Sequence, residues 1–177
     1  MSDRPLWTCP RCGRTFANVN QSHTCAALGS VDAHFDGKDP AVRAAFERVL
    51  AVLAPLGSVE VLAERSRIAL HARMSFAAFT PRRHWLDGHL VLARRAEHPL
   101  FRKVEVYSAR NVLHAFRLTS PADVDDAFAA LVAEAYAVVG KSTSGTDYGR
   151  RYHGTARLSR ALSCRNRKTL ADPVASA

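Results

Sequence analysis

The sequence lacks the long apolar segments that lead a chain into or across a membrane. Its longest apolar run, Val49 to Leu56, is far shorter than the roughly 20 residues that a helix needs to span a bilayer, and it contains Pro55. The opening residues, MSDRPLW, show no apolar core of a secretory signal. We therefore expect a soluble, cytoplasmic protein with no membrane partner.

Signatures of common enzyme families are also missing. The Gly-x-Ser-x-Gly elbow of many hydrolases is absent. Gly140-Lys141-Ser142 resembles the end of a phosphate-binding loop, but the position of its first glycine holds Ala135, and a predicted helix precedes the run where a strand is required. Cys164 lies among arginines without a histidine held beside it, so we interpret it as an incidental thiol. These absences favour a protein that binds over one that catalyses.

Basic residues exceed acidic residues by 25 to 16, but the excess is unevenly distributed. Residues 1–140 carry a formal charge of +3, whereas residues 141–177 carry +6. Clustered arginine and lysine attract polyanions through their phosphates without reading a base sequence. We therefore expect a basic, flexible tail that is either simply solvated or adds nonspecific attraction to nucleic acid.

Cysteine is scarce, yet three of the four cysteines fall near the N-terminus in CPRCGRTFANVNQSHTC. In a reducing compartment, Cys-x-x-Cys followed by a second pair of ligands is typical of a zinc site. Gly13 and Pro10 suit a tight turn around the first pair. The two-residue spacing of the second pair points both side chains to one side of an extended segment. The predicted ligands are Cys9, Cys12, His23 and Cys25.

Four protein ligands fill a tetrahedral zinc site and leave no position for a reactive water. We therefore predict structural zinc, with Trp7 and Phe16 forming a small core that the metal holds in place. A DNA-reading finger needs two histidines on one helical face, which this spacing does not provide. Two alternatives remain: free or redox-paired thiols, and His34 as the fourth ligand in place of His23.

Two segments show helical periodicity. Asp39-Pro40 predicts a helix start in which Asp39 can cap the helix, and apolar residues at helical spacing continue until Gly57 ends the run. Ser120-Pro121-Ala122-Asp123 predicts a second helix start, and helical spacing then continues to Gly140. The chain should therefore carry one helix before and one after the segment between them.

The segment between the helices alternates with a period of two. The alternation from Ile68 to Ala77 predicts one long, half-buried strand. The other predicted strands are 59–62, 86–92, 103–107 and 112–118. Helix, antiparallel strands, helix describes an α+β domain, in which two helices flank an antiparallel sheet of about five strands. We expect a zinc knuckle in residues 1–30, the α+β domain in 31–140 and the basic tail in 141–177.

If both helices cover one face of the sheet, the other face meets solvent or a ligand. Alternation places cations, imidazoles and aromatic rings there, which suit an anionic or planar ligand. An ordinary solvated face, whose charge pairs only aid strand pairing, is the alternative. His114 instead follows the apolar alternation, so we predict a satisfied core histidine. The candidate ligand-binding residues are His71, Arg73, Trp85, His89, Lys103, Tyr107 and Arg117, on a face that also carries Ser75, Asp87 and Glu105.

The order of several motifs resembles a known family. The motifs are WTCPRCGRTF and NQSHTC, then AHFDGKDPAVRAAFERVL, RIALHARMSFAAF, RRHWLDGHLVL, NVLHAFRL and AFAALVAEAY. Over residues 7–140 they resemble the bacterial family called domain of unknown function 5655, in the form with an N-terminal zinc knuckle. The resemblance implies the same four metal ligands and places His114 and Arg117 in the HxFR strand of the family. It implies no catalytic residue.

We therefore expect a non-catalytic binding protein with a structural zinc site, whose open sheet face takes an anionic ligand, with nucleic acid as the first candidate. A small enzyme that uses His71, Asp87 and His89 in a pocket on the sheet is one alternative. A protein–protein docking module is another, and it would show an exposed apolar patch and a stable dimer. The sequence leaves the oligomeric state open.

Overall fold

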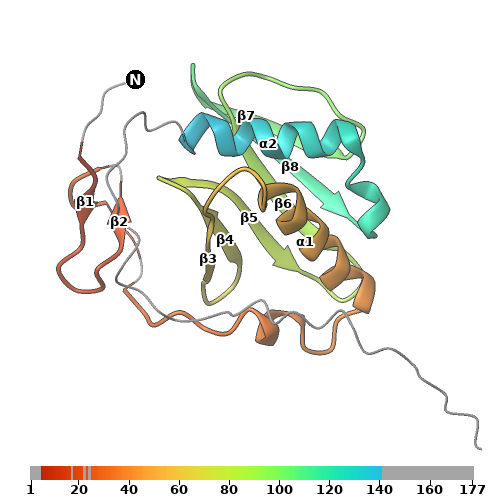
Figure 1. The fold of residues 1–177 in the computed structure, drawn as a ribbon, viewed down its shortest axis with the longest axis horizontal. Helices are drawn as coiled ribbons and strands as arrows, with labels where there is room; N and C mark the ends of the chain where they lie inside the picture. The colour runs from red at the N-terminus through yellow and green to blue at the C-terminus, as the bar shows by residue number, and fades with distance from the viewer. Residues whose placement is uncertain (1–4, 17, 22, 24, 141–177) are drawn as a thin grey trace, which may run out of the picture. The chain divides into compact units, whose positions relative to one another are not determined.

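The structure is a computed structural model, which describes residues 5–16, 18–21, 23 and 25–140 (Figure 1). Every described residue lies in one compact unit, Met1–Thr143. The predicted tail at 141–177, including Cys164, therefore lies outside the described residues. The domain boundary predicted near residue 30 falls inside this unit and stays a prediction.

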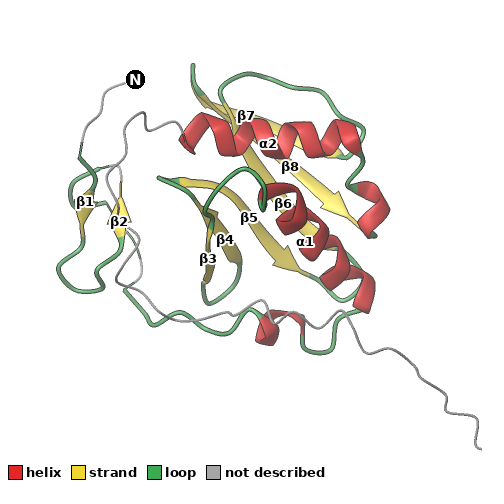
Figure 2. Cartoon of the chain, viewed as in Figure 1, coloured by secondary structure: helices red, strands yellow, loops and turns green. Residues whose placement is uncertain are grey.

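The predicted α+β class and the order helix, strands, helix are confirmed (Figure 2). A small two-stranded sheet precedes a six-stranded antiparallel sheet. Within the described part of the chain, every helix is too short or too polar to cross a bilayer. In chain order the elements are β1 (Trp7–Thr8), β2 (Thr15–Phe16), the 3-10 helix η1 (Asp32–Phe35), α1 (Pro40–Leu53), β3 (Glu60–Ala63), β4 (Ile68–His71), β5 (Ser75–Pro81), β6 (Leu86–Leu92), β7 (Phe101–Ser108), β8 (Asn111–Leu118), the 3-10 helix η2 (Pro121–Asp123) and α2 (Asp126–Gly140).

Helix α1 begins where the sequence predicted it. Pro40 occupies the first helical position, where its missing N–H leaves no intrahelical bond unmade. Asp39 precedes it, but its side chain makes no capping hydrogen bond. The carboxylate instead lies 2.6 Å from Nδ1 of His84, in the turn between β5 and β6. The expected side-chain cap is therefore wrong, because a partner far along the sequence takes the carboxylate.

The main sheet has the strand order β3-β4-β5-β6-β8-β7, with every neighbouring pair antiparallel. The single long strand predicted from Ile68 to Ala77 is wrong, because the chain reverses within it. Ala72 donates its N–H to the carbonyl of Met74 at 3.2 Å, and this tight turn joins β4 to β5. The turn contains no glycine, proline or asparagine, and the alternation continues through it. The sheet therefore gains a sixth strand.

The second helix start is divided in two. Ser120 and Asp123 form the predicted capping box, but they cap the short 3-10 helix η2. Helix α2 begins three residues later, where the Asp125 carboxylate accepts the N–H of Phe128 at 2.7 Å. The capping residues Ser120 and Asp123 were predicted correctly, but the helix that they cap is the short η2 and not α2.

Both helices lie on one face of the main sheet and pack against each other (Figure 1). A chain of phenylalanine rings joins the layers, because Phe46 of α1 meets Phe79 of β5, which meets Phe116 of β8, which meets Phe128 of α2. Each contact is edge to face, with ring centroids 4.9 to 5.9 Å apart. Gly88 of β6 lies beneath this chain, where a side chain would collide with Phe116.

The face of the sheet away from the helices also holds buried residues. Leu62, Ala69 and Ala78 form a separate buried cluster, each at most 3% exposed. They are cross-strand neighbours on β3, β4 and β5, and the same row continues to His89 on β6. This face therefore has a floor of small apolar side chains next to its polar residues.

Candidate functional site

The predicted metal ligands lie around the hairpin formed by β1 and β2. Trp7 pairs with Phe16 across this hairpin, and Cys9 and Cys12 lie in its turn. Gly13 adopts φ +71°, a left-handed conformation that glycine takes without steric cost, and donates its N–H to the carbonyl of Cys9 at 2.9 Å. Cys-x-x-Cys-Gly therefore forms the tight knuckle that its sequence predicted.

The four predicted ligands converge on one point. The sulfurs of Cys9, Cys12 and Cys25 and one ring nitrogen of His23 all lie within 4.8 Å of one another. Nε2 of His23 lies 3.3 Å from the Sγ atoms of Cys12 and Cys25, and the Sγ atoms of Cys9 and Cys25 are 3.8 Å apart. Ligands at tetrahedral corners about 2.3 Å from an ion stand roughly 3.8 Å apart, so this geometry fits a metal ion.

The second nitrogen of His23 is already committed. Nδ1 donates a hydrogen bond to the carbonyl of Gln21 at 2.6 Å, which directs Nε2 toward the sulfurs. The ring also packs on Phe16, with centroids 4.1 Å apart, and Trp7 lies at the edge of the same group. The predicted small core of Trp7 and Phe16 is confirmed, and it fixes the orientation of the imidazole.

Two of the three thiols, those of Cys9 and Cys12, are prepared to carry negative charge. The backbone N–H of Arg14, followed by its side chain, lowers the pKa of Cys12 to about 6. Burial alone would raise the pKa of Cys9, but the backbone amides of Arg11 and Cys12 lower it below its ordinary value. Burial and the neighbouring thiols raise the pKa of Cys25, as expected for three sulfurs that crowd one site before a cation neutralises them. This donor set can hold a metal ion.

The alternative ligand His34 lies elsewhere. It belongs to η1 and takes no part in the cluster of four. The Cys3His set of Cys9, Cys12, His23 and Cys25 is therefore complete without it.

On the main sheet, the turn between β5 and β6 is held rigidly. Arg82 donates its N–H to the carbonyl of Trp85 at 2.8 Å and closes the turn. Asp39, at the start of α1, donates its N–H to the carbonyl of Arg83 at 2.9 Å, in addition to the contact of its carboxylate with His84. The turn therefore presents its side chains from a fixed backbone.

Two of the predicted ligand-binding residues meet beside this turn. The guanidinium of Arg117 lies over the ring of Trp85, 4.2 Å from its centroid. Nε of Arg117 donates to one oxygen of Asp87 at 2.9 Å, and Nε of Arg82 donates to the other at 3.1 Å. Asp87 and Arg117 are direct cross-strand partners on β6 and β8. We call Arg82, Trp85, Asp87 and Arg117 the arginine cluster.

The electrostatics of the arginine cluster follow from these contacts. Burial would raise the pKa of the Asp87 carboxyl, but Arg117, Trp85 and Arg82 together lower it below its usual value. Nε1 of Trp85 is buried and makes no hydrogen bond of full geometry within the described part of the chain. One carboxylate therefore faces two permanent cations, and the cluster keeps a net positive charge.

The predicted histidines of the open face form a second group. Burial lowers the pKa values of both His71 and His89; the charge of Arg67 lowers them further, and Glu64 offsets part of the shift at His71. Within the described residues, no hydrogen bond joins His71, Asp87 and His89 to one another. The relay that the enzyme hypothesis needs is therefore missing from this arrangement, because Asp87 is engaged by arginines instead.

The remaining predicted residues lie apart from these two groups. Lys103 forms an ion pair with Glu105 at 2.6 Å, and the hydroxyl of Tyr107 donates to the same carboxylate at 3.3 Å, all on the edge strand β7. Arg73 lies in the turn between β4 and β5, because the predicted long strand is a hairpin. The predicted residues of this face thus make three distinct sets of side-chain contacts, and Arg73 lies in a turn.

Sequence reasoning missed Arg82. It lies in a predicted turn, and alternation says nothing about side chains outside the strands. The signal that could have found it is the run Pro81-Arg82-Arg83 directly before the strand that carries Asp87, since a short hairpin turn brings such neighbours back together.

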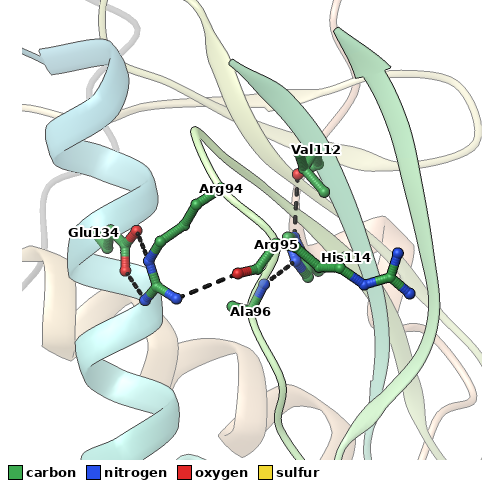
Figure 3. Close-up of polar contacts among 6 residues, drawn as sticks. All are labelled: Arg94, Arg95, Ala96, Val112, His114 and Glu134. Carbon is green, nitrogen blue, oxygen red and sulfur yellow. Dashed lines mark hydrogen bonds and ion pairs between the residues drawn. The ribbon is translucent and has the colours of Figure 1, made fainter. Parts of the chain in front are cut away.

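The predicted core role of His114 is confirmed. The ring is fully buried on β8, and both of its nitrogens have backbone partners (Figure 3). It is therefore a structural histidine, in contrast to Arg117 on the same strand, which belongs to the arginine cluster.

Comparison with known proteins gives one match. The model of the family described as Domain of unknown function (DUF5655) matches residues 31–139, from η1 to the end of α2. No curated protein and no solved structure matches the chain. The match covers the main sheet and both helices and begins after the four metal-site residues.

Proposed function

We propose that this chain, which belongs to the family described as Domain of unknown function (DUF5655), is a non-catalytic binding protein with a structural zinc knuckle and a sheet face that binds an anionic ligand. Nucleic acid is the ligand class that we favour. The observation that carries the proposal is the arginine cluster, in which Arg82 and Arg117 share the single carboxylate of Asp87.

The chemistry of the arginine cluster suits a phosphate chain. Each bond to Asp87 uses an Nε donor, and a guanidinium carries four further N–H donors on its Nη atoms that can bind phosphate oxygens. Asp87 orients both groups before any ligand arrives, which reduces the ordering cost of binding. The aromatic ring of Trp85 beside Arg117 adds the stacking element that single-stranded nucleic acids use.

Other cations on this face give less support to anion binding. Lys103 is matched by Glu105, and Arg67 by Glu64, at 2.6 and 2.7 Å. Each of these pairs has no net charge. The excess positive charge that we assign to ligand binding is therefore concentrated at the turn between β5 and β6, next to the end of β8.

Zinc is the metal that we propose for the knuckle. Three thiolates and one imidazole in a tetrahedral arrangement match the ligand preference of zinc in proteins. Because the protein supplies all four ligands, the ion would have a structural role and no open position for a reacting water. Its chemistry is then confined to holding the hairpin of β1 and β2 and the segment that carries His23 and Cys25.

Elemental analysis of the purified full chain tests the zinc assignment. We expect about one zinc ion per chain, and cobalt substitution should give the intense visible bands of a tetrahedral, sulfur-rich site. A protein that folds with no bound metal, or a cobalt spectrum typical of octahedral coordination, would overturn the assignment.

Fluorescence anisotropy with labelled single- and double-stranded oligonucleotides tests ligand binding over a series of salt concentrations. We expect Arg117→Ala and Arg82→Ala each to weaken binding roughly tenfold at low salt and to reduce the salt slope by about 1. Arg117→Lys keeps the charge but loses the planar contact with Trp85, so it should recover only part of the affinity.

Arg94→Ala is the matched control. Arg94 is also an exposed arginine, but it pairs with Glu134 of α2 on the helix side of the molecule. Its loss should leave the affinity nearly unchanged. Absence of binding at low salt would exclude nucleic acid as the ligand. If Arg82→Ala and Arg94→Ala lost the same amount of affinity, the net charge of the protein would explain the binding and the arginine cluster would have no special role.

A further inference from the structure

The two edges of the main sheet are unequal. β3 has four residues, and outside it Gly29 donates its N–H to the carbonyl of Ala63 at 2.8 Å, so part of that edge is occupied. β7 has eight residues and, among the described strands, pairs only with β8. A long edge strand presents a row of backbone groups that can pair with another strand. Within the part of the chain that the structure describes, β7 is therefore the free edge of this sheet.

The exposed apolar residues of β7 indicate that this edge has a partner. Val106 and Tyr107 are 61% and 65% exposed, whereas most large apolar side chains of the described chain are buried. They are adjacent in sequence and lie at the end of the edge strand. Exposed apolar groups at a strand edge favour association, because pairing removes them from water together with the backbone.

The charges of β7 match a second copy of the same strand. If two copies pair antiparallel about Val104, Lys103 of each copy lies directly opposite Glu105 of the other. Opposite charges at such positions stabilise strand pairing. A centre at Lys103 or at Glu105 would instead place two like charges opposite each other, which disfavours those registers. Lys103 and Glu105 already share one face of the sheet, as their 2.6 Å ion pair shows.

The irregularities of β7 confine this pairing to a short stretch of the strand. The register with β8 shifts between Phe101 and Lys103 and again between Val106 and Ser108, which leaves a regular stretch from Lys103 to Val106. Such shifts twist a strand and restrict pairing to the regular part. A twofold pairing uses the β7 edge of both copies, and the outer strands of the joined sheet are then the short β3 strands.

We propose that two copies of this chain associate through β7, antiparallel about Val104, so that their main sheets form one continuous sheet. The pairing involves neither the knuckle nor the arginine cluster, so it stands independently of the proposed function. The partner of the β7 edge is thus a second copy of the chain, and the opposite charges of Lys103 and Glu105 set the register of the pairing.

Charge reversal tests the proposal in the full chain. Sedimentation velocity should show a reversible dimer of twice the 19.4 kDa single-chain mass, populated in the micromolar range. Lys103→Glu places glutamates opposite each other, and Glu105→Lys does the same with lysines. Each variant alone should raise the dimer dissociation constant about tenfold or more, because like charges now face each other across the interface.

Mixing the two variants gives the decisive result. Their charges are complementary only between chains, so an equimolar mixture should form heterodimers that neither variant forms with itself. A purely structural role of these residues within one chain could not produce this rescue. Arg94→Glu, which reverses a charge on the helix side, should leave the dimer unchanged.

Three outcomes would overturn the proposal. The first is a wild-type chain that stays monomeric at high micromolar concentration. The second is a dimer that is insensitive to both reversals, which would place the interface on another surface. The third is a mixture of the variants that stays as monomeric as its components, which would show that the two side chains do not meet across the interface.

Discussion

The backbone N–H of Ala96 donates a hydrogen bond to Nε2 of His114 at 2.9 Å (Figure 3). The bond fixes the tautomer, because Nε2 must keep its lone pair and Nδ1 must carry the proton, which it donates to the carbonyl of Val112 at 3.1 Å. One buried ring therefore ties the loop between β6 and β7 to the interior of β8. The same loop is also held from outside by the ion pair of Arg94 with Glu134.

Acid should weaken this fold through its buried histidines. Burial lowers the pKa values of His114, His71 and His89 below the ordinary value of 6.5. Below pH 6.5 these histidines bind protons in the unfolded chain but remain neutral in the folded chain. The free energy of unfolding should therefore be highest above pH 6.5 and fall as the pH drops below it. Urea unfolding from about pH 8 to about pH 5 measures this slope.

His114→Gln separates His114 from the other two histidines. Glutamine offers an acceptor for Ala96 and a donor for Val112 without a titrating ring, so the variant should be less stable at neutral pH but should lose less stability in acid. An unchanged slope would show that His114 is not one of the titrating groups. The slope that remains in this variant would belong to His71 and His89.

Asp123→Ala should destabilise the start of the C-terminal helical segment. The carboxylate accepts the N–H of Ser120 at 3.0 Å and the hydroxyl of Thr119 at 2.9 Å. Loss of a cap of this kind costs about 1 kcal/mol, which should appear in the urea midpoint with an unchanged m-value. Asp36→Ala is the control, since Asp36 is exposed, and it should leave the midpoint nearly unchanged. Equal effects of the two variants would contradict the cap.

Gly88→Ala should strain the core. A Cβ at this position would collide with the ring of Phe116 and lie 3.1 Å from Cδ1 of Phe79, and both rings are held by further aromatic contacts. Overpacking of this kind costs roughly 1–3 kcal/mol, measurable by thermal or urea unfolding. Gly29→Ala is the matched control, because its nearest neighbour would be at an ordinary 3.7 Å. A neutral Gly88→Ala would mean that Phe116 can move without cost.

Cys12→Ser should remove the metal and loosen only the knuckle. Three remaining ligands bind an ion far more weakly than four, and the bound ion is what joins the β1–β2 hairpin to the segment that carries His23 and Cys25. Hydrogen exchange should accelerate there while the six strands keep their protection. Cys164→Ser should retain the metal. Simultaneous loss of protection in both regions would show that the knuckle and the α+β part fold as one unit.

The sequence predicted the features that depend on local spacing. The Cys-x-x-Cys and His-x-Cys spacings identified all four residues that the fold brings together, because a metal site built on a hairpin needs only short-range geometry. The strand and helix segments followed from periods of two and 3.6 residues for the same reason.

Features that depend on pairing across the sheet were not predictable. The turn at Ala72 to Met74 leaves no mark in the alternation, so one strand was expected where two exist. The ion-pair partners of the charged residues were not predictable either. Asp87 and Arg117 are thirty residues apart in the sequence, and only the register of β6 with β8 brings them together.

The strand order has a consequence for assembly of the fold. Four of the five strand pairings in the main sheet join consecutive strands, and the fifth, β6 with β8, passes over the single strand β7, so most of the sheet can form with short chain closures. Helix α1 precedes the six strands in the sequence and α2 follows them, so the contact between the two helices joins segments that are far apart in the chain. The entropy cost of closing the chain is therefore smallest for the hairpins and largest for the packing of α1 against α2. Packing of the two helices is thus the folding step with the greatest sequence separation.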